Sequence, residues 1–182
     1  NAECIDPLHP ICGPAQTCLV CTADTDCESG VCEVEGSCLS ESAILYASAT
    51  GVETGSCEAR SPCELFYARS LIDESRFTIL LAEGNYSLPV PFDIDATRPR
   101  VRIVGGGNVV ANGSFGGPAF RVTAGGSLVA RDVTSNAMVC VGGRIALSRV
   151  QSSCRAVTQR SWVHRWRARR SRASSRETRI RG

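Results

Sequence analysis

A glycine-rich repeat in the middle of the chain constrains its fold more than any other feature. Each copy has a Gly-Gly pair, a polar residue and a short run of small and aliphatic residues, and the copies begin at Gly106, Gly125 and Gly142. They are 19 and 17 residues apart. Helical-hairpin repeats need roughly 33 to 47 residues, whereas short strands joined by glycine turns suit a shorter period. The spacing therefore predicts a solenoid of stacked parallel strands with aliphatic residues in a shared interior.

Strand and helix patterns before the repeat extend this solenoid towards the N-terminus. Residues 44–48 and 77–88 have the composition and alternation of strands. Between them, the sequence Ser-Pro-Cys-Glu from Ser61 has the spacing of a helix N-terminus, which predicts a helix over about 62–74. This helix would cover the first turn of the solenoid, because an uncovered end exposes unpaired strand edges.

Charge is distributed unevenly, which divides the chain into three parts. Residues 1–59 carry ten acidic residues and no Arg, residues 60–150 carry seven acidic residues and ten Arg, and residues 151–182 carry one acidic residue and ten Arg. All 20 basic residues are Arg, so mechanisms that depend on lysine are excluded. We expect a cysteine-rich module over 1–40, a solenoid over 41–152 and an Arg-rich tail over 153–182.

Nine of the 11 cysteines lie within residues 1–63. Such density is typical of an oxidising compartment, where disulfide bonds replace a core that is too small to support itself. We therefore expect a secreted or cell-surface protein with its signal peptide removed ahead of Asn1. No apolar run approaches the roughly 20 residues that span a bilayer, so no transmembrane segment is predicted. The disulfide candidates are Cys12, Cys18, Cys21, Cys27, Cys32, Cys38, Cys57 and Cys63, the last two bridging one loop.

The cysteine-rich segment also suggests two metal hypotheses. Four cysteines within 18–32 could bind zinc, but a zinc ribbon usually has two Cys-x2-Cys knuckles and this segment has one. Asp24 and Asp26 are candidate calcium ligands, although two carboxylates fall short of the roughly six to eight oxygen ligands that calcium takes. We predict disulfides in place of zinc and solvated turns at both aspartates, and calcium is the only cofactor that the pattern suggests.

Two stretches resemble known families. Residues 21–32 read Cys-Thr-Ala-Asp-Thr-Asp-Cys-Glu-Ser-Gly-Val-Cys, which is similar to the Dickkopf-type cysteine-rich region and to repeats in secreted myxobacterial proteins. From Ile44 to Val150, an initial strand, a cysteine-flanked loop, a helix, Thr-Ile-Leu-Leu-Ala-Glu-Gly-Asn-Tyr and Val-Arg-Ile-Val-Gly-Gly-Gly follow in turn. This order resembles the opening of right-handed parallel β-helix proteins of the pectin-lyase-like superfamily. The resemblances imply a mainly β fold, a short right-handed parallel β-helix with an N-terminal capping helix, preceded by a small disulfide-rich module.

The candidate catalytic residues are Asp93 and Asp95. Lyases of the resembled superfamily use calcium-binding carboxylates and a Lys or Arg base, and the related hydrolases use clustered aspartates. Asp93 and Asp95 would point the same way on a strand, and paired carboxylates act as acid and base when their pKa values are driven apart. Neighbouring prolines favour a turn with solvated carboxylates instead.

Other polar groups of the solenoid have simpler interpretations. Asp132 is expected to form a surface pair with the adjacent Arg131. Asn85 and Asn112 each begin an Asn-x-Ser sequon, which has meaning only in a host that glycosylates. The Gly-Gly-Gly sequence at 105–107 is explained by a corner of the solenoid without invoking a phosphate-binding loop.

We therefore predict a binding or structural role for this chain and lean against an enzyme. The expected partner is a polysaccharide or cell-surface glycan. One alternative is a polysaccharide lyase or glycoside hydrolase, which the resemblance alone supports, and a fold does not confer a reaction. A second alternative is polyanion binding through the Arg-rich tail, without specific recognition of nucleic acid.

The tail itself has three competing interpretations. The first is a disordered basic segment that binds polyanions, and the second is an amphipathic helix that lies on a membrane surface. The third is a sequence that is read out of its original frame. We favour the last interpretation, because glycine-spaced strands stop after Ser152 while a solenoid rarely ends uncovered after so few turns.

Overall fold

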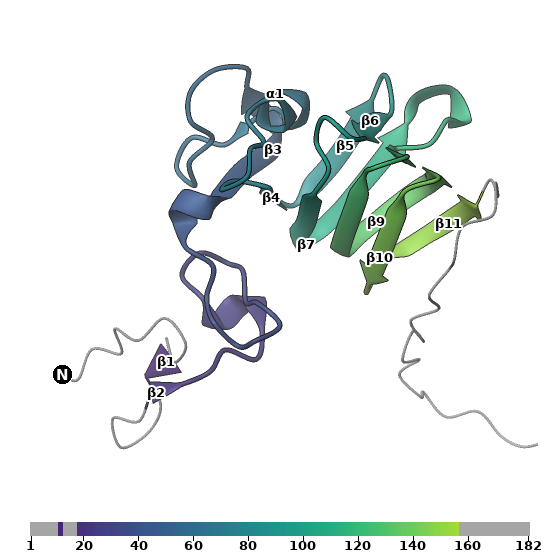
Figure 1. Ribbon diagram of the computed structural model, residues 1–182. Helices are drawn as coiled ribbons and strands as arrows, with labels where there is room; N and C mark the ends of the chain where they lie inside the picture. Colours follow the sequence, from purple (N-terminus) through teal and green to yellow (C-terminus); the bar gives the residue numbers. More distant parts are fainter. Residues whose placement is uncertain (1–10, 13–17, 157–182) are drawn as a thin grey trace, which may run out of the picture.

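The computed structural model describes residues 11–12 and 18–156, which form a mainly β fold (Figure 1). Side chains are described for residues 19–152. Residues 157–182, which make up most of the Arg-rich tail, lie outside the described part of the chain. The three interpretations of the tail fall on these residues.

Strands dominate the described residues. They are β1 (Ile11–Cys12), β2 (Cys18–Leu19), β3 (Ile44–Val52), β4 (Thr78–Leu81), β5 (Gly84–Leu88), β6 (Phe92–Ile94), β7 (Val101–Gly113), β8 (Phe120–Thr123), β9 (Ser127–Val141), β10 (Arg144–Ser148) and β11 (Gln151–Ala156). A helix, α1 (Leu65–Ser70), follows β3, and single 3-10 turns lie at Asp24–Asp26, Glu41–Ala43 and Ser114–Gly116.

Strands β3 to β11 pair in parallel and form one curled sheet (Figure 1). The long strands β7 and β9 bend, so the pairings fall into three ladders. The first ladder contains β3, β4, the start of β7, the start of β9 and β10. The second contains β5, the end of β7, the middle of β9 and the start of β11, and the third contains β6, β8 and the ends of β9 and β11.

Inward-facing apolar residues stack in register inside the curl. In the first ladder, one such column is Leu45, Ile79, Ile103, Ala130 and Leu147. In the third ladder, Phe92 pairs with Phe120 and their rings lie 5.8 Å apart, centroid to centroid. Alternate residues of each strand face inwards, so stacking the turns buries one continuous core.

The glycine repeat marks corners of this curl, but its three copies are not equivalent. Leu128 pairs with Ile145, and the Gly125 and Gly142 turns before them both have a positive φ, of 83° and 76°. In contrast, Val109 pairs with Val133, so the Gly106 copy lies at a corner one ladder further along the turn. Glycine is needed at both kinds of corner, which makes them look alike in sequence.

The predicted helix over about 62–74 is wrong in its extent. Helix α1 has six residues, and Glu64 is its N-cap instead of the predicted third helical residue. Cys63 cannot join the helix because it forms a disulfide bond with Cys57 and its backbone forms β-bridges with Ala47 and Val52. Leu65 and Ala68 of α1 are buried in the main core.

Disulfide bonds are confirmed in the described residues. Cys21 is bonded to Cys32, Cys27 to Cys38, and Cys57 to Cys63. The side chains of Cys12 and Cys18 are outside the described set, and Cys140 is a free, half-buried thiol.

The cysteine-rich segment packs against the outer face of the first ladder. Val31 is fully buried against Ile44 and Val104, and Leu39, Tyr46 and Leu80 surround them. This contact is a second, smaller apolar cluster outside the curl.

The boundary predicted between solenoid and tail at residue 152 falls inside a strand. Strand β11 continues to Ala156 and keeps its parallel pairing with β9, with a register shift between Ser152 and Ser153. The sheet therefore extends beyond the last glycine-spaced segment.

Candidate functional site

The two candidate catalytic carboxylates lie close in the chain but in different environments. Asp93 is in β6, and both of its oxygens accept hydrogen bonds from Arg121 of β8, at 2.5 and 2.7 Å. Asp95 follows the strand and closes a turn by accepting from the backbone and hydroxyl of Thr97. These bonds hold the pKa of Asp95 below its ordinary value. Asp93 is thus in a fixed ion pair, and Asp95 has the turn position that the prolines suggested.

The candidate calcium ligands Asp24 and Asp26 also bind groups of the protein itself. Asp24 accepts from the backbone of Cys32 at 2.7 Å and from Arg131 at 2.6 Å. Asp26 accepts from Thr22 and from the backbone of Ala23, which lowers its pKa. Both carboxylates therefore accept hydrogen bonds within the cysteine-rich segment, and Asp24 also bonds Arg131 of the sheet.

Three cysteines of the zinc hypothesis lie together, but as disulfides. The sulfurs of Cys21, Cys27 and Cys32 are all within 4.8 Å of one another. Since Cys21 bonds Cys32 and Cys27 bonds Cys38, these sulfurs have no thiolate to offer zinc. The three sulfurs lie close together because the two disulfide bonds are neighbours.

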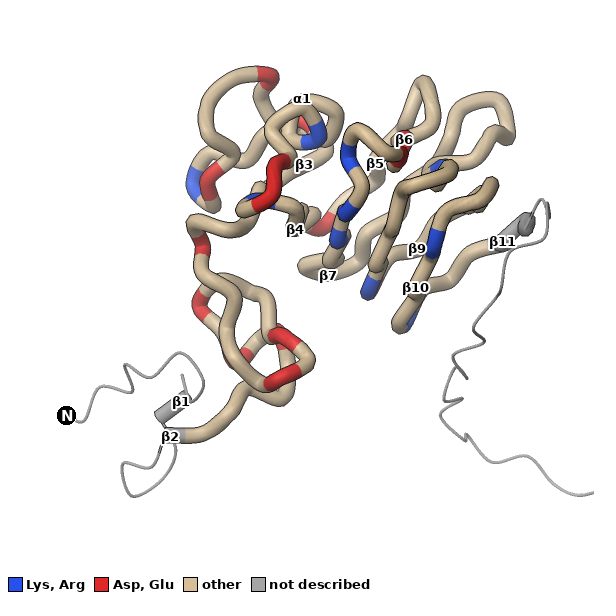
Figure 2. Tube along the Cα trace, viewed as in Figure 1, with Lys and Arg blue, Asp and Glu red and all other residues tan. Residues whose placement is uncertain are grey.

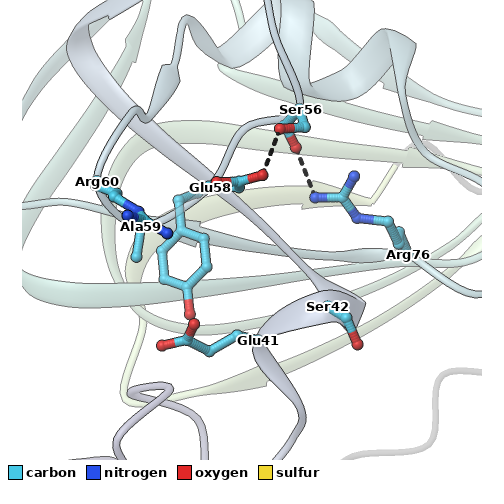
Figure 3. A pocket seen from close by; sticks show the side chains of 8 residues that line it. Glu41, Ser42, Ser56, Glu58, Ala59, Arg60 and Arg76 are labelled. Carbon is cyan, nitrogen blue, oxygen red and sulfur yellow. Dashed lines mark hydrogen bonds between the residues drawn. The ribbon is translucent and has the colours of Figure 1, made fainter.

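A polar hollow of about 460 Å³ lies beside β3 (Figure 3). It is lined by Glu41, Ser42, Tyr46, Ser56, Glu58, Ala59, Arg60 and Arg76. A neighbouring hollow of about 380 Å³ lies against the cysteine-rich segment and shares Glu41 as a lining residue. Glu41, which both hollows share, lies just before the chain enters β3.

Arg76 organises the floor of the first hollow. Its terminal nitrogen donates to the carbonyls of Ile44 and Ser56, at 2.9 and 2.7 Å, and the hydroxyl of Ser56 donates to Glu58 (Figure 3). The Nε of Arg76 is buried without a hydrogen-bond partner. Burial, assisted by the nearby charge of Glu41, raises the pKa of Tyr46, and its hydroxyl donates to the carbonyl of Ser29 at 3.3 Å. The carboxylates and guanidinium groups that line the hollow are acceptors and donors for a polar ligand.

A group of arginines on the strands of the curled sheet lies beside the acidic cysteine-rich segment (Figure 2). Arg102 of β7 pairs with Glu33 at 2.7 Å, and Arg131 of β9 pairs with Asp24 and donates to the carbonyl of Cys32. The predicted pair between Asp132 and Arg131 is therefore wrong. Asp132 bonds Arg149 of the next turn through both oxygens, because the two residues occupy consecutive corners of the sheet.

Sequence reasoning missed Arg76, Tyr46 and the first-ladder arginines. Each acts through contacts with residues far away in the chain, such as the 69 positions between Arg102 and Glu33. The one available signal was the opposite charge of residues 1–59 and 60–150, which is consistent with attraction between the two parts.

Comparison of the chain with protein-family models, curated proteins and solved structures gives no match. In the described part of the chain, none of the helices has the length and apolar character to cross a membrane.

Proposed function

We propose that this chain is a secreted or cell-surface protein built on a short right-handed parallel β-helix, and that it binds polysaccharide. The three ladders of parallel strands support the β-helix, and the disulfides of the cysteine-rich segment support an oxidising location. The sequence resemblance to pectin-lyase-like solenoids agrees with both points.

The observation that carries the binding role is the register of the exposed faces. Parallel strands about 4.8 Å apart repeat their outward side chains at each turn, which gives a regular surface for a polymer that is itself regular. The polar hollow adds a second place where sugar hydroxyls could find donors and acceptors. The carboxylates proposed for catalysis are held by Arg121 and by a turn, which favours binding over turnover.

Affinity electrophoresis of the full chain through gels that contain a neutral glucan, a polyuronate or a sulfated galactan tests this proposal. We expect retardation by at least one polymer, with no release of products. Unchanged mobility in all three gels would refute the binding role. Unsaturated or reducing-end products that disappear in Asp93→Ala would instead support a lyase or hydrolase.

A further inference from the structure

The outer face of the second ladder carries uncharged polar side chains in register. One column across the strands is Asn85, Val110, Thr134 and Gln151. Beside it, Ser87 pairs with Asn112, and the exposed Asn136 of β9 lies one position beyond the Ala111–Ser135 pair. Between these positions Tyr86, Ala111 and Ser135 are buried, so the named polar residues face outwards.

A fully exposed aromatic ring stands at the edge of this face. Phe115 lies in the turn Ser114–Gly116, directly after the part of β7 that belongs to the second ladder. Its φ is 55°, in the left-handed region that bulky residues rarely adopt. Backbone strain of this kind persists only where the surroundings impose it, and it is concentrated at functional positions.

Asn136 holds the Phe115 turn in place. Its Oδ1 accepts from the Gly113 amide at 3.0 Å, and its Nδ2 donates to the Gly113 and Gly117 carbonyls at 3.3 and 3.0 Å. A Cβ on Gly113 would lie 2.4 Å from the Gly117 carbonyl oxygen, so the turn is closed tightly. The ring is therefore presented to solvent on a restrained loop.

The apolar edge continues into the previous turn of the sheet. Leu88 pairs with Gly113, so the segment after β5 leaves the sheet at the same corner as the Phe115 turn. Val90 in that segment is 58% exposed and lies between two prolines. Charged residues at the preceding corner, Asp132 and Arg149, neutralise each other.

We propose that this face binds an uncharged polysaccharide chain that runs across the strands. A pyranose ring has an apolar face of C–H groups and a rim of hydroxyls. Phe115 would stack on the apolar face, while the side-chain amides of Asn85, Asn112 and Gln151 bond the rim. The absence of charge from the two columns selects against polyuronates and sulfated chains. This assignment rests on the polysaccharide-binding function proposed above.

Titration of the full chain with a soluble neutral glucan, followed by calorimetry, tests the assignment. Phe115→Asn removes the ring but suits a left-handed backbone, and we expect about a tenfold rise in Kd. Asn112→Ala should raise Kd several-fold, and Phe115→Trp should retain binding. Val34→Ala is the matched control, because Val34 is an equally exposed apolar residue in the cysteine-rich segment.

The outcomes separate this assignment from the wider function. Glucan binding that Phe115→Asn and Asn112→Ala leave unchanged would overturn the assignment to this face but keep polysaccharide binding. Binding restricted to the polyuronate or the sulfated galactan would do the same. No binding to any polymer would overturn both proposals. A glycan attached to Asn85 or Asn112, seen by intact mass, would also overturn the assignment because it would cover the face.

Discussion

Tyr86 places a hydroxyl group inside the core of the second ladder. Its side chain is 4% exposed, and the hydroxyl donates to the carbonyls of Ala47 and Ala82, at 3.1 and 2.8 Å. These bonds connect β5 to β3 and to the segment after β4. Removing the hydroxyl takes one hydrogen bond from each carbonyl, and the Ala47 carbonyl keeps only its bond from the Ala82 amide. Lost hydrogen bonds of this kind are costly near the core.

Burial raises the pKa of Tyr86 to about 12, from an ordinary value of 10.0. The unfolded chain therefore loses this proton at lower pH than the folded protein, so the contribution of Tyr86 to stability is complete below pH 10 and is lost as pH rises towards 12. We expect urea midpoints of the wild type to fall over this window. Tyr86→Phe should be less stable at pH 7 and should show a shallower decline above pH 10.

Tyr67→Phe is the control for this measurement, because the Tyr67 hydroxyl bonds a carbonyl in an exposed loop. It should keep the alkaline decline of the wild type. An alkaline decline in Tyr86→Phe as steep as that of the wild type would contradict the role assigned to the buried hydroxyl.

Helix α1 depends strongly on its N-cap because it has only six residues. The Glu64 carboxylate accepts from the amides of Phe66 and Tyr67, at 2.6 and 3.0 Å. Glu64→Ala removes the oxygen that accepts both bonds, and we expect the free energy of unfolding to fall by about 1 kcal/mol. Urea denaturation checks this value, with the exposed residue change Glu74→Ala as control. Equal midpoints for the two variants would show that the cap is dispensable.

The elements show which parts of the fold the sequence can predict. Local patterns predicted that a helix follows Ser61 and that strands flank Gly84, because capping and alternation depend on neighbouring residues. They did not predict that α1 begins at Leu65, since the bridges of Cys63 to Ala47 and Val52 come from residues over ten positions away. The sequence also did not predict that the Gly106 copy lies at a different corner from the other two copies, because this position depends on the pairing of β7 with β9. Exposed Asn85 and Asn112 were visible in the sequence only as sequons, because their shared face requires the register.

The interface that holds the cysteine-rich segment against the curled sheet has an apolar centre and a charged rim. Val31 packs on Val104 at the centre, and the pairs Glu33–Arg102 and Asp24–Arg131 lie at the rim. The side chains of these pairs are between 20% and 27% exposed, so water screens them only in part. The Nε of Arg131 is buried without a hydrogen-bond partner. Loss of the Asp24 carboxylate would leave the same guanidinium partly buried without its ion-pair partner, which lowers stability.

The double variant Asp24→Asn with Glu33→Gln should therefore loosen the cysteine-rich segment from the first ladder while its disulfides remain. We expect amide hydrogen exchange over residues 19–40 to accelerate by about tenfold, equivalent to about 1.4 kcal/mol. Exchange in the strands β7 and β9 should change less, because their core lies inside the curl. High salt should bring the wild type part of the way towards the variant.

Asp93→Asn provides the matched control, since it removes one carboxylate from an ion pair with Arg121 that lies within the curled sheet. It should leave exchange over residues 19–40 unchanged. If the double variant also leaves that exchange unchanged, Val31 and its apolar neighbours hold the segment alone, and the charged rim serves only to set its orientation.

The distinction matters for the hollow beside β3, because Glu41 and Tyr46 line it where the segment enters the sheet. A loosened segment would widen that hollow, whereas the outer face of the second ladder, which the segment does not contact through these pairs, would bind as before.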